Sequence, residues 1–336
     1  MEGVIMRNQQ TKPYHDKVAL VFIYVFSFLF IFNLVHNEPI HTYIKTIKSN
    51  SIHVNLPEDK LAHQIKTLAE KVDQPAVDAK IDSIWKAIQG YDGIKVNQEK
   101  TYQLSKVLGQ VSMETLIIEK VSPSITLEDL PAHPIYRGNP QKPMISFMVN
   151  VAWGTEYVTQ MLDLFDDYQI KVTFFLDGMW LKDHEDIARE MIKRGHEIGN
   201  HAYSHPDLSK KSNQAIHSEI VKTEKLIKKL GVHSQLFAPP SGSYDQRVVE
   251  IADKLNMKVV LWTLDTVDWK KPSAEQIVGR IVPNLTNGAL ILMHPTSSTV
   301  KALPSIIESA LQKEFHFGTA SELLSTDRVL SVVGVD

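Results

Sequence analysis

Apolar residues along the chain follow three patterns, which change near residues 37 and 144. The first is a run at 18–36 that contains no Asp, Glu, Lys or Arg and is rich in Phe, Val, Leu and Ile. As a helix this run would measure roughly 28 Å, close to the hydrocarbon thickness of a bilayer. It predicts an uncleaved membrane anchor after an N-terminal tail at 1–17. A cleaved signal peptide is the alternative, although no small-x-small motif follows the run.

The second pattern predicts a stalk at 37–55 and a small α/β domain at 56–122. Helical spacing of apolar residues predicts helices, and short apolar runs predict strands. The expected helices cover 61–72, 77–88 and 98–108, and the expected strands cover 93–96 and 115–118. Five prolines between 123 and 143 mark a linker.

The third pattern, over 144–326, alternates apolar strands with amphipathic helices and is followed by a C-terminal tail at 327–336. Such alternation indicates parallel βαβ units, and this many repeats favour a barrel-like closure. The chemistry is then expected at the carboxyl ends of the strands. The expected strands cover 145–151, 172–176, 197–200, 236–238, 259–264 and 289–293. The expected helices cover 157–168, 185–194, 214–230, 247–255 and 274–281.

Composition and charge narrow the range of functions. The chain has 336 residues, of which 43% are hydrophobic and 22% charged, as in an ordinary globular protein. A net charge of -3 gives no reason to expect nucleic-acid binding. The chain has no cysteine, which excludes disulfides, thiolate metal sites and a cysteine nucleophile.

Polar residues with catalytic potential stand directly after the predicted strands. His201 and His205 are four residues apart, so one helical turn would place both imidazoles on one face, at a spacing suited to zinc or a similar ion. His294 ends an apolar strand. Taken alone, histidines placed like His201 and His205 are more often surface or hydrogen-bonded core residues, and a histidine placed like His294 is as often structural as catalytic. Their combination in this order is the specific signal.

Four stretches together resemble the polysaccharide deacetylases of the NodB-homology type, carbohydrate esterase family four. They are Val-Thr-Phe-Phe-Leu-Asp-Gly at 172–178, Gly-His-Glu-Ile-Gly-Asn-His at 195–201, the Ser-His continuation at 204–205, and Leu-Met-His at 292–294. The resemblance covers about 143–324 and implies a distorted parallel (β/α) barrel. The Trp153-Gly154 pair is most similar to relatives from spore-forming bacteria, which suggests a role in sporulation or the cell envelope.

In active members, this resemblance implies metal-assisted removal of an acetyl group from an amino sugar. An Asp and two His hold a divalent metal, a second Asp acts as base, and a late His protonates the leaving amine. An Arg that orients the base pairs with an Asp of the fourth motif. By resemblance, His201 and His205 are the metal ligands, His294 is the late histidine and Asp265 is the fourth-motif Asp.

Three positions depart from the family pattern. Asn150 replaces the base, Val151 or Ala152 replaces the metal Asp, and Ala238 replaces the Arg. A neutral amide cannot accept a proton as a carboxylate does, so Asn150 is a poor base. Loss of an anionic ligand weakens metal binding, so zinc or a similar divalent metal is expected to be weakly bound or absent.

The sequence therefore predicts a single-pass cell-membrane protein whose extracytoplasmic domain binds cell-wall glycan with little or no hydrolysis. One alternative is an active, rewired deacetylase that uses Asp265 or Asp268, with Asp177 as another carboxylate near the mouth. Another is a scaffold role for residues 56–122. The predicted glycan-contacting residues are Trp153, Tyr203, Pro240 and Trp269; these aromatic residues and Trp262 either stack on sugar rings or pack beneath the loops.

Overall fold

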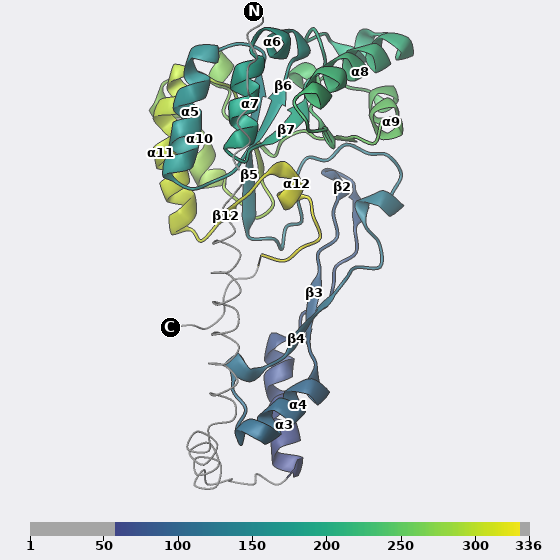
Figure 1. The fold of residues 1–336 in the computed structure, drawn as a ribbon, viewed down its shortest axis with the longest axis vertical. Coiled ribbons are helices and arrows are strands. Elements are labelled where there is room, and N and C mark those ends of the chain that lie inside the picture. The colour runs from purple at the N-terminus through teal and green to yellow at the C-terminus, as the bar shows by residue number, and fades with distance from the viewer. Residues whose placement is uncertain (1–57, 330–336) are drawn as a thin grey trace, which may run out of the picture.

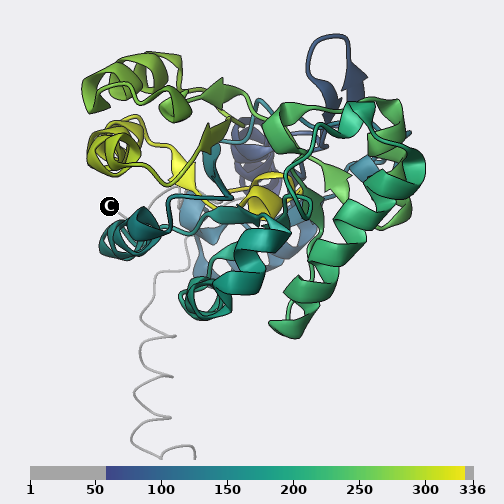
Figure 2. The same cartoon turned by 90° about the horizontal axis from the view of Figure 1, so that it is seen from above.

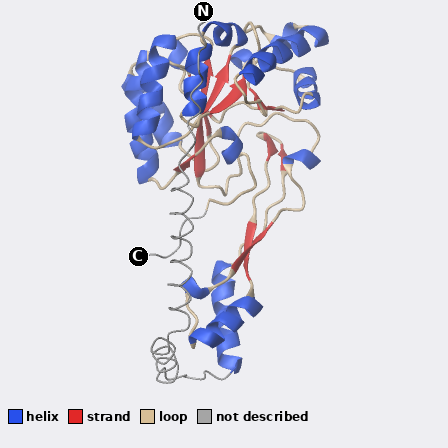
Figure 3. Cartoon of the chain, viewed as in Figure 1, coloured by secondary structure: helices blue, strands red, loops and turns tan. Residues whose placement is uncertain are grey.

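A computed structural model describes residues 58–329, and every structural statement below refers to that part of the chain. The described chain is elongated (Figure 1). One end holds an open parallel sheet surrounded by helices, and the other holds two helices beside a small two-stranded sheet. Figure 3 shows that the strands of the larger sheet gather at the centre of the upper part, with helices around them.

The large sheet is a parallel half-barrel. Its strand order is β10-β11-β5-β6-β7-β8-β9, and β12 pairs with the first two residues of β5. Within the described residues β9 and β10 do not pair, so the barrel stays open. The strands are β5 (Met144–Val151), β6 (Thr173–Leu176), β7 (Glu197–Asn200), β8 (Leu236–Phe237), β9 (Lys258–Val259), β10 (Leu264–Asp265), β11 (Leu290–Met293) and β12 (His316–Phe317). The predicted parallel β/α architecture is confirmed at this level.

Strand β5 shows why this sheet is built from nearly continuous apolar runs. Its outward-facing side chains, including Phe147 and Val149, join the core beneath the helices. Met148 packs on the other face with Phe175 and Ala238, in the interior of the half-barrel. Both faces are buried, as is usual for parallel strands covered by helices. The alternation of side chains along the strand turns Asn150 to the same face as Met148.

Helices cover the outer face of the sheet, and five of them match the predicted ranges within about two residues. These are α5 (Thr155–Asp167), α7 (Glu185–Lys193), α8 (Asn213–Lys229), α9 (Gln246–Lys254) and α10 (Ala274–Ile281). Three helices were not predicted: α6 (Gly178–Asp183), α11 (Ser297–Gln312) and α12 (Ala320–Leu323). Two of these are short, and α11 contains Pro304, which disfavours a helix interior. Short 3-10 turns lie at 113–115, 127–129, 208–210, 240–242, 268–270 and 282–284.

The other end of the molecule contains α3 (Glu58–Val72), α4 (Gln98–Leu108), β3 (Gly93–Val96) and β4 (Ile118–Val121). The ranges predicted for α4 and β3 match the structure, whereas β4 begins three residues later than expected. Helix α4 has clear local signals at both ends. The Asn97 side chain accepts a hydrogen bond from the Lys100 N–H, and Gly109 ends the helix in a left-handed conformation.

The helix predicted over 77–88 is wrong, because this segment forms an antiparallel hairpin of β1 (Lys80–Asp82) and β2 (Lys86–Ile88). The Asp82 carboxylate accepts hydrogen bonds from the backbone N–H groups of Ile84 and Trp85, at 2.8 and 2.9 Å, and so closes a turn. Ile84 is 72% exposed. The apolar spacing resembled one helical face, but part of it lies on the surface.

This hairpin joins the two ends of the molecule, with β2 beside the half-barrel in Figure 1. The Gln89 side-chain amide donates to the Leu324 carbonyl at 3.0 Å, and Asn139 donates to the Gln89 carbonyl at 2.9 Å. Ala87 packs in the same interior cluster as Met148. Contacts with the half-barrel therefore begin within the predicted 56–122 domain. The boundaries at 122 and 143 stay predictions.

Among residues 58–329, no helix has the length and apolar character needed to cross a bilayer. The predicted anchor at 18–36, the tail before it and the stalk at 37–55 lie outside the described residues, as do residues 330–336.

Candidate active site

The predicted site residues follow the carboxyl ends of the sheet strands. Helix α6 begins directly after β6 and lies at the top of Figure 1, so this edge faces away from α3 and α4. Figure 2 looks onto the same edge from above and shows the helices arranged around the open sheet. Loops after β5, β7, β8, β10 and β11 contribute to the site.

His201 and His205 lie together in the loop after β7. Their ring centroids are 5.1 Å apart. The His201 ring is buried, and its Nδ1–H donates to the Ala238 carbonyl at 2.7 Å. That bond leaves the lone pair on Nε2 in the neutral ring. Burial lowers the pKa of His201 to about 3, and the nearby His205 acts in the same direction. His205 is exposed at the rim, yet enough protein surrounds its ring to lower its pKa as well.

The spacing of the two histidines suggested that one helical turn brings them together, but they lie in a loop. Residues 201–205 form a loop in which Ala202 and His205 adopt positive φ angles of 61° and 52°. Such conformations are unfavourable for side chains other than glycine, so neighbouring groups must hold them. The Ala202 carbonyl accepts from the Gly178 N–H at 2.9 Å and from the Thr223 hydroxyl at 2.7 Å.

Glu219 on α8 holds the middle of this loop. Its Oε2 accepts hydrogen bonds from the backbone N–H groups of Tyr203 and Ser204, at 2.9 and 2.8 Å. Its Oε1 accepts from the Ser204 hydroxyl at 3.0 Å. One carboxylate therefore orders the segment between the two histidines. Sequence reasoning missed Glu219, because nothing in its spacing from the histidines indicates this contact.

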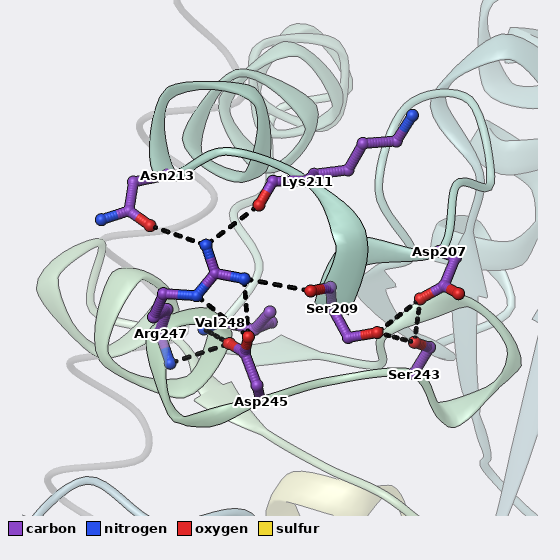
Figure 4. Close-up of polar contacts among 8 residues, drawn as sticks. All are labelled: Asp207, Ser209, Lys211, Asn213, Ser243, Asp245, Arg247 and Val248. Carbon is purple, nitrogen blue, oxygen red and sulfur yellow. Dashed lines mark hydrogen bonds and ion pairs between the residues drawn. The ribbon is translucent and has the colours of Figure 1, made fainter.

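A second polar network holds the chain that follows His205 (Figure 4). The Arg247 guanidinium donates to the carbonyls of Ser209 and Lys211, at 3.0 and 3.1 Å, and pairs with Asp245 at 2.7 Å. Asp207 accepts hydrogen bonds from the hydroxyls of Ser209 and Ser243. The network fastens the histidine loop to the loop between β8 and α9.

Asn150 occupies an interior position with an unused acceptor. Its side chain is 4% exposed, and Oδ1 has no hydrogen-bond partner among the described residues. Val151 is fully buried in the core under the helices, whereas Ala152 lines a pocket that also contains His205. Ala238 is also fully buried and packs inside the half-barrel.

His294 is held by Asp268. The His294 Nδ1–H donates to Asp268 Oδ1 at 2.7 Å, and the His294 backbone N–H donates to Oδ2 at 2.6 Å. The Thr299 hydroxyl also donates to Oδ2, at 2.6 Å. Burial alone would raise the pKa of Asp268, but the hydrogen bonds and charge of His294, with help from Thr299, hold it below its usual value.

The carboxylate that contacts His294 is therefore Asp268, a contact that the sequence analysis did not predict. The assignment of Asp265 as the fourth-motif Asp, the partner of the family's Arg, stays a prediction. Asp265 lies at the end of β10 and is partly exposed, and its carboxylate accepts from the Val267 N–H at 2.7 Å. The two aspartates are three residues apart, and spacing alone did not reveal which one turns inward.

Trp153 stacks on His294, with ring centroids 5.6 Å apart and ring planes 9° apart. The loop after β5 approaches the loop after β11 closely at Gly154, where a Cβ would lie 2.0 Å from the Pro295 carbonyl oxygen. Gly154 also has a φ of 78°, which favours glycine. The Trp153-Gly154 pair thus lets the loop after β5 reach the late histidine. The Trp153 side chain remains 45% exposed at the rim.

The other predicted glycan-contacting residues are spread over different loops. Trp269 is 52% exposed, with the Lys270 ammonium 4.8 Å from its ring centroid. The Tyr203 ring lies beneath the Lys222 ammonium, at 5.4 Å. Pro240 is buried in the turn after β8. Trp262 is partly buried and packs against the interior cluster.

A pocket of about 360 Å³ opens beside His205. Its walls come from the loops after β5 and β7 and from α6, through Ala152, Asp177, Met179, Trp180, Asp183, His184, Ser204 and His205. Asp177 caps α6 by accepting from the Trp180 N–H at 3.0 Å. Burial raises the pKa of Asp177 to about 6.

The histidine pair meets part of the requirement for a divalent metal. Both imidazoles are neutral near pH 7, as metal ligands must be, and the Ala238 carbonyl fixes the tautomer of one of them. Among residues 58–329, however, no three His, Cys, Asp or Glu side chains are grouped so that they could hold one ion. Two ligands are present without a third.

Known proteins share both the sequence and this arrangement. A family model described as polysaccharide deacetylase matches residues 137–260. A crystal structure of BA3943, a CE4 family pseudoenzyme from Bacillus anthracis, is 39% identical, with a TM-score of 0.75, and the match covers 80% of this chain and 96% of that one. This chain belongs to the polysaccharide deacetylase family, carbohydrate esterase family four. The resemblance stated from the motifs is confirmed.

Two further relatives indicate the range of this deacetylase family. The Bacillus subtilis protein YlxY, described as uncharacterized, is 40% identical over 92% of this chain and 97% of its own length. A Bacillus cereus peptidoglycan-N-acetylglucosamine deacetylase is 33% identical over 50% of this chain and 82% of its own length. The pseudoenzyme and YlxY thus match beyond the deacetylase domain, whereas the B. cereus enzyme matches half of the chain.

Replacing Glu219 with alanine is expected to weaken Zn²⁺ binding by the histidine pair about 10- to 100-fold, the usual effect of losing a group that orients metal ligands. The loop between His201 and His205 would lose three hydrogen bonds. Zn²⁺ titrations followed through the histidine ring signals in NMR spectra measure the change. Glu250→Ala, at an exposed position on α9, is the control. Equal Zn²⁺ affinities of wild type, Glu219→Ala and Glu250→Ala would contradict the view that Glu219 orders the histidine loop.

Proposed function

We propose that this protein is a membrane-anchored, extracytoplasmic member of the deacetylase family that binds cell-wall glycan with little or no hydrolysis. The observation that carries the proposal is the combination at the sheet edge. An ordered histidine pair and an ordered Asp268–His294 pair follow strands that end at the same sheet edge as β5, where Asn150 stands in place of a base.

The absence of a base at Asn150 is the first support. General bases typically contribute about 10²–10⁴ in rate, and a neutral amide has no comparable basic lone pair. The described residues place no carboxylate at position 150, 151 or 152, and Ala238 occupies the family's arginine position. The divalent metal that the family uses is therefore expected to be weakly bound or absent.

The proposed ligand comes from the relatives. Similar proteins include peptidoglycan-N-acetylglucosamine deacetylases, and a similar solved structure is described as a pseudoenzyme. A protein that retained the glycan-contacting rim and lost the base would bind the same class of polymer. Trp153 supports this, because its exposed ring offers an apolar face for a sugar. The segment 18–36 is the basis for proposing a membrane location.

Two measurements on one preparation of the full-length protein test this proposal. Purified peptidoglycan should pull the protein down, while N-acetylglucosamine oligomers incubated with protein and Zn²⁺ should release no acetate above the His201→Ala background. Acetate release that disappears in His201→Ala would show a working enzyme. Absence of peptidoglycan binding would remove the proposed ligand.

An active, rewired deacetylase is the second candidate, and Asp265 is the residue that keeps it open. Asp265 is partly exposed after β10, and its carboxylate accepts a hydrogen bond from the Val267 N–H at 2.7 Å. Asp268 is a weaker choice, because it is fully buried and both of its oxygens serve His294 and Thr299. Acetate release abolished in Asp265→Asn would favour this candidate.

A further inference from the structure

The pocket beside His205 has an acidic wall and is lined by no lysine or arginine. Asp177 and Asp183 are among its lining residues. Its volume of about 360 Å³ lies within the range of small-molecule sites, roughly 300–1,000 Å³. The pocket shares Ala152 and His205 with the candidate site, so a ligand at the sheet edge would reach it.

Asp177 is the feature that points to a ligand. Its side chain is 3% exposed, Oδ1 accepts a hydrogen bond from the Trp180 N–H at 3.0 Å, and the backbone N–H groups of Met179 and His205 also stabilise the charged carboxylate. Oδ2 has no hydrogen-bond partner among the described residues. A buried carboxylate with an unused oxygen is unfavourable, and a cation that donates to it removes that cost.

The wall around Asp177 is held by hydrogen bonds and ring stacking and is partly apolar. The Trp180 indole N–H donates to the Thr155 hydroxyl at 2.9 Å, and its ring stacks on His184 with centroids 4.8 Å apart. The His184 Nδ1–H donates to the Trp180 carbonyl at 2.8 Å. Met179 is 54% exposed at the edge. An apolar wall beside an acidic acceptor suits a sugar ring that carries a positive charge.

We propose that this pocket binds an amino sugar with a free ammonium group, so that the protein recognises de-N-acetylated stretches of the glycan. The proposal rests on the proposed glycan-binding function and specifies its ligand. An ammonium donates to Asp177 Oδ2, whereas an N-acetyl group brings no charge to it. The acidic wall also disfavours sugars with carboxylate substituents, because like charges repel.

The test compares two oligosaccharides of one length on full-length protein in detergent, by isothermal titration calorimetry at low salt. The probes are the glucosamine tetramer and the N-acetylglucosamine tetramer, with tetralysine as a polycation control. Wild type should bind the glucosamine tetramer about tenfold or more tightly than the acetylated one, since a charged hydrogen bond of this kind supplies that ratio. Tetralysine should not compete.

Asp177→Asn should bring the ratio of the two affinities close to one, because asparagine keeps the α6 cap and removes the charge. Asp183→Asn, at the exposed edge, should lower the ratio less, and it provides a folded test if Asp177→Asn is unstable. Asp167→Asn, at an exposed position on α5, is the charge-matched control.

Equal affinity of wild type for the two tetramers, an unchanged ratio in both aspartate variants, or full competition by tetralysine would each overturn the inference. Equal affinities would leave the proposed glycan-binding function intact. Failure of both tetramers to bind would overturn the inference together with that function, so the two failures are distinguishable.

Discussion

A variant with Asn150→Asp, Val151→Asp and Ala238→Arg is expected to deacetylate N-acetylglucosamine oligomers about 10²–10⁴ times faster than wild type when Zn²⁺ is supplied. The three changes restore the base, the anionic metal ligand and the arginine of the family pattern. The rest of the required set is in place, since His201 and His205 lie together and Asp268 orders His294. Acetate release is the measurement.

The structure explains why the three positions should act together. Asn150 already faces the interior with an unpartnered Oδ1, so an aspartate there fits the same space. If only the base were restored, the metal site would still lack its third ligand, and no bound metal ion would activate the attacking water.

The missing metal ligand has two candidate positions, 151 and 152, and a second variant distinguishes them. Val151 is packed in the core, whereas Ala152 lines the pocket with His205. A parallel variant therefore carries Ala152→Asp in place of Val151→Asp. Whichever variant is active identifies the position of the missing ligand. His201→Ala in the active background should abolish the gain, and inactivity of both folded variants would show that more than these three positions has changed.

Much of the half-barrel could be predicted from the sequence, because its local signals agree with its tertiary structure. The strands buried on both faces are short apolar runs, and the helices between them are amphipathic. The hairpin at 80–88 shows the limit of this reasoning. Its apolar spacing resembled a helix, but the Asp82 carboxylate closes a turn and leaves Ile84 exposed. Spacing alone does not record which apolar residues are buried.

The candidate site could be predicted in part, for a related reason. Motifs identify residues that stand after strands, so His201, His205 and His294 were found. The groups that orient them come from distant positions, as Glu219 does from α8 and Arg247 from α9. The partner of His294 was not predicted, because it depends on which aspartate side chain turns inward after β10. Local spacing carries no information on that point.

Replacing Asp268 with alanine is expected to lower the free energy of unfolding by about 3 kcal/mol, because it removes a fully buried carboxylate that is hydrogen-bonded to the partly buried His294. The His294 backbone N–H and the Thr299 hydroxyl would also lose their acceptor. Urea denaturation at pH 7 measures the loss. The pKa of Asp268 is lowered in the folded state from its usual 3.8, so its contribution is fully present above that pH and disappears as the pH falls further.

Asp265→Ala is the matched control for Asp268, because it removes a carboxylate three residues away that is partly exposed and accepts from Val267. Its expected cost is about 1 kcal/mol, the usual value for one hydrogen bond. Thr299→Val should lie between the two, since it removes one donor to Asp268. Equal losses for Asp265→Ala and Asp268→Ala would contradict the view that Asp268 holds His294. The predicted order therefore tests which aspartate of this segment orders the late histidine, in a protein that need not turn over.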